Sequence, residues 1–241
     1  MKNLPAGLLR DAARVIRSGW VGSSAAERLR ATTESTMPGS DDPTSVLIAD
    51  AALRQFELFG LMRATIEDIA RRARVGRVTV YRHFLGKDGL IEAVTLREVR
   101  KFLAELDSVV MVLDDPEERI VEGFVFTLQA ARQHRLLQRM IDSEPEMALP
   151  WLTTQGASLI AAATEYLAAH MARDLDDDRG GPELLETAEI VVRLIVSFLL
   201  TPKVGIDLND DARARAFARR YLRPMLAASD GTLTPKQDQR Q

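Results

Sequence analysis

The sequence contains no cysteine, which excludes disulfide bonds, thiolate metal sites and cysteine nucleophiles. Histidine occurs at only three positions, His83, His134 and His170. These histidines lie far apart in the sequence, and none belongs to a cluster with the spacing of metal ligands. We therefore expect no metal site, no catalytic residue and no cofactor, which leaves an all-α enzyme as a weak alternative.

Long apolar runs are also absent. No uninterrupted run approaches the roughly 20 residues that a membrane-spanning helix needs. The closest, Ile190–Leu200, contains Arg193 and follows Glu189, which predicts a buried helix instead. With 46 % apolar residues the chain can form a sizeable core, so we expect a soluble, cytoplasmic protein with no membrane partner.

Charge is distributed unevenly along the chain. Residues 44–103 contain eleven Lys/Arg and seven Asp/Glu, a net charge of +4, whereas residues 104–241 contain fifteen and twenty-three, a net charge of −8. A basic segment joined to an acidic one suits a protein that binds phosphate at one end, although soluble domains also differ this much by chance. Asp142, Glu144 and Glu146 form an acidic cluster at a helix end, which predicts a solvated turn.

Residues 65–84, TIEDIARRARVGRVTVYRHF, carry the strongest functional signal. Thr65 precedes a short amphipathic helix as its expected N-cap, a turn follows near Arg74-Val75-Gly76, and a second short helix reaches Phe84. Val75, Val80 and Phe84 would form the inner face. The outer faces are polar and cationic, as in a helix-turn-helix that enters the DNA major groove. The alternative is a solvated helical hairpin within an α-bundle.

Two neighbouring segments favour the DNA-binding interpretation. Residues 46–60, VLIADAALRQFELFG, predict a preceding helix that ends at Gly60. Residues 87–103, KDGLIEAVTLREVRKFL, predict a following helix with an apolar stripe. The cationic turn would then be packed into a compact three-helix unit.

From Ile48 to Val94, the segments IADAALRQFELFG, ATIEDIARRARVGRVTVYRHF and GKDGLIEAV resemble, without a gap, the DNA-binding head of the TetR family of transcriptional regulators. The TVYRHF-x-x-KD portion is specific. The chain departs from the family pattern at Arg74, where glycine is common, and at Gly76, where serine is common. The lost serine weakens a helix cap, and the arginine strains the turn or adds a phosphate contact.

Roles for the exposed residues of this head follow as hypotheses. Arg77 is the best candidate for a base contact, because a guanidinium pairs bidentately with guanine. Val78 would touch a thymine methyl group or clear the groove, and Arg82 would contact a base or a phosphate. The phosphate contacts are assigned to Thr65, Thr79, Tyr81, His83 and Lys87.

The chain divides into four expected regions. Residues 1–43 are an N-terminal extension expected to be poorly ordered, and residues 229–241 are a disordered tail. Residues 44–103 form the DNA-binding domain with a connecting helix, and residues 104–228 form a helical ligand-binding and dimerisation domain. Arg10, Arg14 and Arg17 would make the extension a DNA-binding arm as an alternative, and Met37 is a plausible natural start.

Beyond Lys101 the periodicity stays helical, which predicts an all-α fold of about nine helices in all. The helices expected there span about 116–133, 134–143, 146–174, 182–200 and 209–227. In TetR-like proteins the last two form a dimer interface, so the resemblance implies a homodimer here. The residues assigned to it are Leu194, Ile195, Phe198, Phe217 and Tyr221. The alternative is that both helices complete a monomer core.

The resemblance also implies a small-molecule pocket among the middle helices, lined by apolar residues that suit a hydrophobic ligand. The candidates are Phe124, Phe126, Met140, Met147, Trp151, Leu159 and Tyr166. Each could instead be ordinary core. The function expected is a homodimeric, nucleoid-associated repressor that binds a palindromic operator through residues 77–84 and is released by a small hydrophobic ligand. The alternatives are a helical interaction module and a constitutive regulator without a ligand.

Overall fold

The computed structural model describes residues 42–172, 182–202 and 205–225. All regular structure within these ranges is helical, with ten α-helices, α3 to α12, and a π-helical segment, η1 (Ala218–Leu222). The all-α class is therefore confirmed. None of these described helices is long and apolar enough to cross a membrane. The tail at 229–241 and nearly all of the N-terminal extension, with its possible arginine arm, lie outside the described residues.

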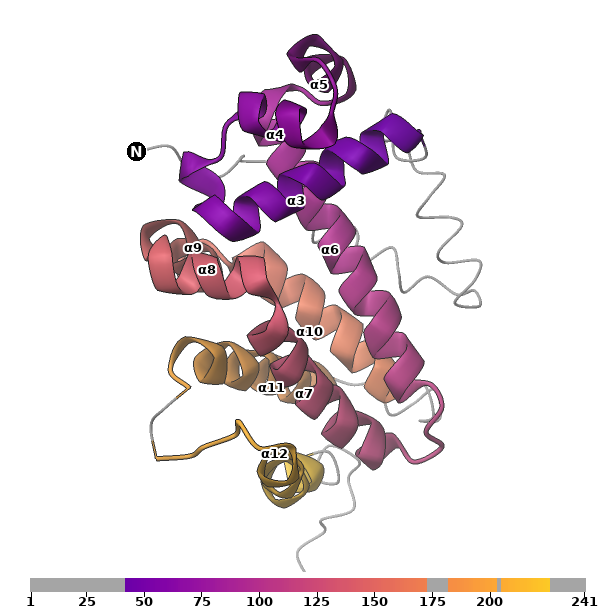
Figure 1. Cartoon of the computed structure of the whole chain (residues 1–241). Helices are drawn as coiled ribbons and strands as arrows, with labels where there is room; N and C mark the ends of the chain where they lie inside the picture. Colours follow the sequence, from indigo (N-terminus) through magenta and orange to yellow (C-terminus); the bar gives the residue numbers. More distant parts are fainter. Residues whose placement is uncertain (1–41, 173–181, 203–204, 226–241) are drawn as a thin grey trace, which may run out of the picture. The chain divides into compact units, whose positions relative to one another are not determined.

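The head is built from α3 (Pro43–Arg63), α4 (Ile66–Ala73), α5 (Arg77–His83) and the start of α6 (Gly86–Val110). Helix α3 begins three residues earlier than the sequence predicts, because the Asp42 side chain accepts from the Ser45 amide and Pro43 fits the first turn. In Figure 1, α4 and α5 lie on the same side of α3. Each of α3, α4, α5 and α6 contributes at least one completely buried side chain, among them Phe56, Ile69, Val80 and Leu90.

Helices α8 (Arg135–Ser143) and α9 (Pro145–Leu152) pack with the head. Helix α3 contacts both α4 and α8, and Leu136 and Met147 join the same apolar cluster as Phe56. By packing, the first compact unit comprises residues 42–107 and 130–163 of the described chain. Helices α8 and α9 belong to this grouping because Leu136 and Met147 join the apolar cluster of the head. The division at residue 104 expected from the sequence stays a prediction.

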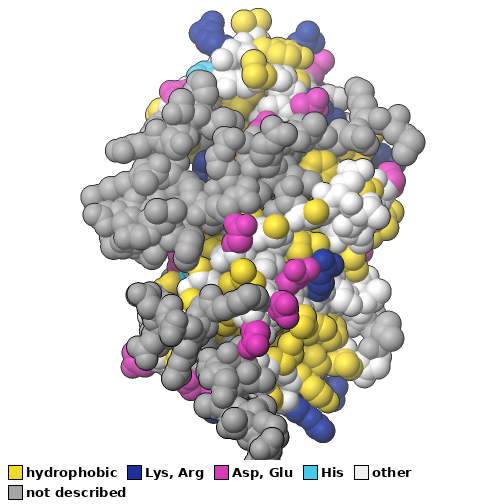
Figure 2. Space-filling view, turned by 180° about the vertical axis from the view of Figure 1, so that it is seen from behind, with side chains coloured by type: hydrophobic (Ala, Val, Ile, Leu, Met, Phe, Trp, Pro, Cys, Tyr) yellow, Lys and Arg dark blue, Asp and Glu magenta, His cyan; other side chains and the backbone are white. Residues whose placement is uncertain are grey.

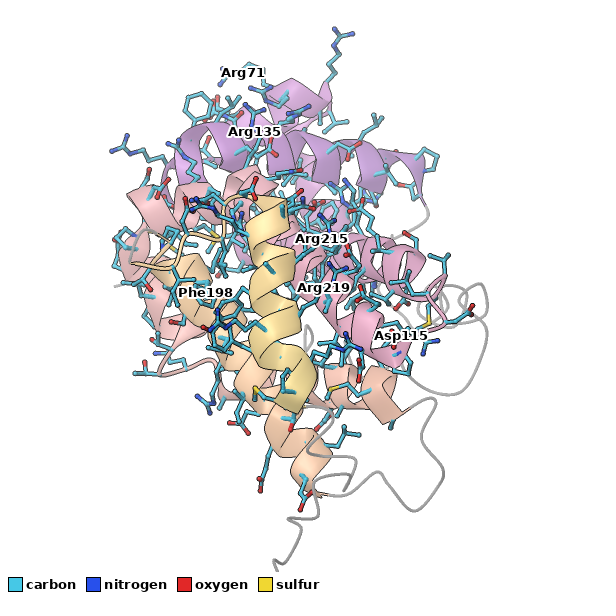
Figure 3. The ribbon with its side chains drawn as sticks, turned by 90° about the horizontal axis from the view of Figure 1, so that it is seen from below. Arg71, Asp115, Arg135, Phe198, Arg215 and Arg219 are labelled. Atoms are coloured by element: carbon cyan, nitrogen blue, oxygen red, sulfur yellow. The ribbon has the colours of Figure 1, made fainter. Side chains whose placement is uncertain are left out.

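Among the described residues, the second unit comprises 108–129, 164–172, 182–202 and 205–225. It contains most of α7 (Pro116–Gln133), the end of α10 (Ala157–Ala172), α11 (Pro182–Leu200), α12 (Asp211–Phe217) and η1. Its apolar cluster includes Phe124, Leu128, Val191 and Leu222. Two arginines on one side of α12 and η1 pair with carboxylates of α7: Arg215 with Glu122 at 2.7 Å and Arg219 with Glu118 at 2.9 Å (Figure 3).

The single helix predicted over residues 146–174 is wrong, because the chain forms α9 and α10 with a break at residues 153–156. Pro150 lies within α9, and Thr153 leaves helical geometry at φ −132° and ψ −100°. Gly156 approaches the backbone so closely that a Cβ there would meet the Trp151 carbonyl oxygen at 2.4 Å. This break gives ten described helices where the sequence predicts about nine.

Candidate DNA-binding interface

Helix α4 begins as the sequence predicts, at a threonine cap. Thr65 has extended backbone geometry, and its Oγ1 accepts from the Asp68 amide at 3.1 Å. The same hydroxyl donates to the Asp68 carboxylate at 2.6 Å, which also accepts from Arg71 at 2.7 Å. These bonds satisfy an amide of the first turn and place negative charge where the helix dipole favours it.

The turn between α4 and α5 depends on a left-handed residue. Arg74 has φ 57° and ψ 38°, and it is the one non-glycine residue with positive φ in the described ranges. Its geometry lets the Val75 amide donate to the Ala70 carbonyl at 3.0 Å, and Val75 packs against the head cluster. The strain that the sequence suggests at Arg74 is therefore present as an unfavourable backbone conformation.

Helix α5 starts without a side-chain cap. Gly76 occupies the N-cap position with φ −73° and ψ 151°, a conformation that any residue can adopt. A Cβ there would meet only Thr79 Oγ1, at 3.8 Å, so the site has room for a serine. The cap inferred from the sequence is therefore weak because Gly76 has no hydroxyl, although a serine would fit there.

One face of α5 is buried and the others point to solvent. Val80 is 0 % exposed, whereas Val78 is 73 % and Tyr81 is 56 % exposed. Arg77 and Arg82 are exposed as well. At the end of the head that carries α5, dark blue basic side chains flank yellow apolar ones (Figure 2). This seven-residue helix therefore presents hydrogen-bond donors and the exposed aliphatic side chain of Val78, which are groups that can contact base edges in a DNA groove.

Arg77 lies near a carboxylate of the preceding helix. Its Nη1 is 3.6 Å from Glu67 Oε2, and the two side chains are 64 % and 66 % exposed. An ion pair this open to water contributes little to stability, so it leaves the guanidinium available to a stronger partner.

Besides Thr65, two more of the residues assigned to phosphate already have partners within the protein. His83 Nδ1 is 2.9 Å from Ser45 Oγ and 3.4 Å from Asp42 Oδ2, at the start of α3. Lys87 Nζ donates to the Met62 carbonyl at 2.9 Å, at the end of α3. Both side chains help to hold the head together, and their phosphate contacts stay predictions, as does that of the half-buried Thr79.

The apolar residues assigned to a ligand pocket fall into two groups. Met140, Met147 and Trp151 belong to the apolar cluster of the head, with Phe56. Of the others, Phe124 and Tyr166 are buried in the second unit, where Phe124 contacts Phe198 and Phe217 with ring centroids at 6.5 and 5.9 Å. The remaining two, Phe126 and Leu159, are half-buried, and the pocket stays a prediction.

The residues assigned to a dimer interface lie on α11, α12 and η1. Leu194, Ile195, Phe198 and Phe217 are half-buried and pack against the cluster of the second unit. In Figure 3, Phe198 lies on the opposite side of α12 from Arg215 and Arg219. Tyr221 is 50 % exposed, with its ring 4.9 Å from that of Phe217.

Glu144 is buried, although the sequence predicts that it is exposed to solvent. The predicted solvated acidic turn is right for the exposed Asp142 and Glu146, but wrong for Glu144, which is 6 % exposed. Its carboxylate accepts from the Leu61 amide at 2.8 Å and the Met62 amide at 2.9 Å. No sequence pattern signals this contact, because its partners are backbone groups more than eighty residues away.

A second carboxylate links α6 to the start of α8. His134 caps α8, with its Nδ1 accepting from the Leu137 amide at 3.2 Å, and its Nε2 lies 3.4 Å from Glu98 Oε2. The hydrogen bond from His134 lowers the pKa of Glu98 below its ordinary value, and partial burial opposes this effect.

Comparison with known proteins agrees with this geometry. Residues 48–94 match the family described as bacterial regulatory proteins, tetR family, and residues 115–220 match the family described as bacterial tetracyclin repressor, C-terminal domain. The chain belongs to the TetR family. The first match covers the helix-turn-helix from α3 to α6, and the second covers most of α7 to η1.

Curated relatives support the same assignment, and solved structures share the fold. An HTH-type transcriptional regulator of Mycobacterium tuberculosis (strain ATCC 25618 / H37Rv) is 28 % identical over 186 residues, covering 74 % of this chain and 83 % of that protein. The HTH-type transcriptional regulator UidR of Escherichia coli (strain K12) is 25 % identical over 177 residues, covering 73 % and 88 %. The crystal structure of the TetR family repressor AlkX from Dietzia sp. strain DQ12-45-1b, implicated in biodegradation of n-alkanes, matches with a TM-score of 0.54 at 23 % identity, covering 80 % of this chain and 98 % of that one.

The structure of the fatty acid degradation regulator FadR from Bacillus halodurans matches with a TM-score of 0.52 at 17 % identity, covering 80 % of this chain and 98 % of that one. At such identities the two solved structures establish the fold. Together with the family matches, the relatives make this chain a DNA-binding transcriptional regulator of the TetR family and not an enzyme.

Proposed function

We propose that this TetR-family regulator is a homodimeric repressor, acting in the cytoplasm on the nucleoid. It binds a palindromic operator through α5 and is released by a small hydrophobic ligand. The observation that carries the DNA-reading part is the surface of α5, where Arg77 and the 73 % exposed Val78 face outward over the fully buried Val80. Buried packing on one side and exposed donors on the other are what a recognition helix needs.

Arg77 is the residue on which base reading depends most. A guanidinium that pairs with a guanine gives specificity at one base pair, whereas phosphate contacts add affinity to every sequence alike. Replacing Arg77 by alanine should therefore relax sequence preference at one position in each half-site, at a cost of about 1–3 kcal/mol there.

The test uses a duplex selected by the wild-type chain from a random library, with every single-base variant of that duplex. Arg54→Ala is the matched control, because Arg54 lies on α3, is 61 % exposed and pairs with Glu57 at 3.2 Å, much as Arg77 pairs with Glu67. Arg77→Ala should flatten the preference at one base pair, and Arg54→Ala should keep it. If both variants lose affinity uniformly, Arg77 does not read a base.

Dimerisation through α11, α12 and η1 would present two copies of α5 to the two halves of a palindromic operator. A single helix-turn-helix reads few base pairs, and a two-fold dimer doubles the contact and sets the half-site spacing. Apolar side chains remain exposed on these helices in the single chain, with Leu185 at 47 %, Ile190 at 45 % and Tyr221 at 50 %. A second copy would bury them.

Sedimentation at micromolar concentration tests the dimer. The wild type should sediment as a dimer, and Tyr221→Asp should shift it toward monomer by burying a charge in the interface. Val112→Asp is the control, since Val112 is 75 % exposed and follows α6. A monomeric wild type, or a Tyr221→Asp chain that stays dimeric, would contradict this interface.

The ligand is proposed to be hydrophobic because the candidate lining is apolar and aromatic, with Phe124 and Tyr166 buried in the second unit. The proposed ligand favours an arrangement of the two heads that does not fit the operator. It then lowers the affinity for DNA, and bound DNA lowers the affinity for the ligand by the same factor. Titrating single-chain fatty acids, n-alkanes and small aromatics into the DNA complex tests this. If none of them changes DNA affinity, the constitutive regulator becomes the better description.

A further inference from the structure

The last turn of α3 is a separate piece of helix. Gly60 leaves helical geometry at φ 83° and ψ 167°, and the chain then makes one more turn, closed by the Ala64 amide donating to the Gly60 carbonyl at 3.3 Å. The first amides of such a turn, those of Leu61 and Met62, have no carbonyl one turn earlier to bond to. They need an acceptor from elsewhere in the molecule.

Glu144 supplies that acceptor from the junction of α8 and α9. Its two carboxylate oxygens accept from the Leu61 amide at 2.8 Å and the Met62 amide at 2.9 Å, so one buried side chain caps the turn. The fit is tight, since a Cβ on Gly60 would come within 2.4 Å of Glu144 Oε1. Charge-assisted hydrogen bonds of this kind are short and strong.

The backbone of Glu144 belongs to two helices at once. It ends α8, with its amide donating to Met140 at 3.1 Å, and it begins α9, with its carbonyl accepting from Met147 at 2.9 Å. A change in the angle between α8 and α9 would therefore shift the backbone position from which the Glu144 carboxylate reaches the end of α3.

The capped turn leads directly into the helix-turn-helix. Ala64 is buried, and Thr65 after it caps α4. The Met62 carbonyl also accepts from Lys87 near the start of α6. The turn held by Glu144 is thus joined to both α4 and α6, the two helices that flank α5 along the chain.

We propose that Glu144 is a positioning residue for the DNA-binding head, and that its bonds to the end of α3 connect the arrangement of α8 and α9 to DNA affinity. The inference rests on the proposed reading of DNA by α5. It adds the contact through which a rearrangement of α8 and α9 would change the DNA-binding head. Glu144 itself touches no DNA in this scheme.

The central test compares Glu144→Gln with Glu146→Gln. Both remove one negative charge at nearly the same place, but Glu146 is exposed and begins α9 without capping α3, so the difference between the variants excludes simple electrostatics. A glutamine at 144 keeps one acceptor and turns its amide group toward the other backbone donor. Affinity for a duplex selected by the wild type should fall roughly 3–30-fold in Glu144→Gln and stay unchanged in Glu146→Gln.

Amide exchange separates positioning from a merely structural role. Exchange at Leu61 and Met62 should accelerate in Glu144→Gln while circular dichroism shows full folding at the assay temperature. Affinity for a random-sequence duplex, held mainly by phosphate contacts, should fall less than affinity for the selected duplex. If the folded Glu144→Gln chain binds the selected duplex as tightly as Glu146→Gln does, the positioning role is overturned and DNA reading by α5 stands.

A second pair of variants keeps the Glu144 carboxylate. One of them perturbs its contact with the end of α3 from the α3 side, and the other is the control. Gly60→Ala pushes a methyl group against Glu144, and Gly205→Ala places one at another positive-φ glycine with nothing within 4 Å. Gly60→Ala should weaken DNA binding and Gly205→Ala should not, and equal affinities would overturn the inference even if Glu144→Gln fails to fold. A wild-type chain that selects no duplex would instead overturn the proposed function, and the positioning role with it.

Discussion

Arg74 adopts a left-handed backbone conformation at φ 57°, and its replacement by glycine should raise the melting temperature of the protein. The side chain is exposed, so the substitution removes little packing. What changes is the backbone, since the left-handed region is unfavourable for any residue with a Cβ and open to glycine.

The size of the effect follows from two opposing terms. The left-handed conformation costs a non-glycine residue about 1–2 kcal/mol, and the greater freedom of glycine in the unfolded chain returns roughly 0.4–1 kcal/mol of this. Subtracting the midpoints of the two ranges leaves a net stabilisation of about 0.8 kcal/mol. This corresponds to roughly 2–3 °C in melting temperature for a chain of this size.

Thermal unfolding followed by circular dichroism measures the change. Arg74→Ala is the control, because it removes the same charge and side chain and keeps the Cβ that makes the conformation unfavourable. Arg74→Gly should melt above both the wild type and Arg74→Ala. If the glycine variant melts no higher than the alanine variant, the turn does not carry the strain inferred from its backbone geometry.

Three further outcomes are expected. Gly76→Ser should cap α5 and raise the free energy of unfolding by about a few tenths of a kcal/mol. A lower melting temperature than that of the wild type would contradict the open space found at Gly76. The pKa of Glu98 is lowered by its hydrogen bond from His134, so its stabilisation exists above the ordinary pKa of about 4.5 and is lost as the pH falls through the lower folded value. The deficit in melting temperature of Glu98→Gln should therefore shrink in acid, and a constant deficit would refute this. Arg219→Ala breaks the exposed pair with Glu118, so its deficit should shrink at about 1 M salt, and a salt-independent deficit would point to packing instead.

Much of the head could be predicted from the sequence because its signals are local. The Thr65 cap, the end of the regular helix at Gly60 and the burial of Val80 follow from spacing and from side-chain chemistry within a few residues. The exposed face of α5 follows in turn, since burying Val80 directs its neighbours outward.

What the sequence could not supply depends on distant partners. His83 and Lys87 look like phosphate ligands in the sequence, yet each has a partner on α3 that only the folded chain brings near. Glu144 looks like a surface carboxylate because its partners are two backbone amides, which leave no pattern in the sequence. The break before α10 differs from these cases, because its signals are local: Pro150 lies within α9, and Gly156 closely approaches the Trp151 carbonyl five residues earlier.

Hydroxyl-radical footprinting of the wild-type dimer on its selected duplex tests the central claim, that α5 reads DNA twice per molecule. The account predicts two protected patches related by two-fold symmetry, with centres about one helical turn, or roughly 10 base pairs, apart. It also predicts that Arg77→Ala weakens protection at matching positions in both patches. A single patch, or two patches that Arg77→Ala leaves unchanged, would contradict it.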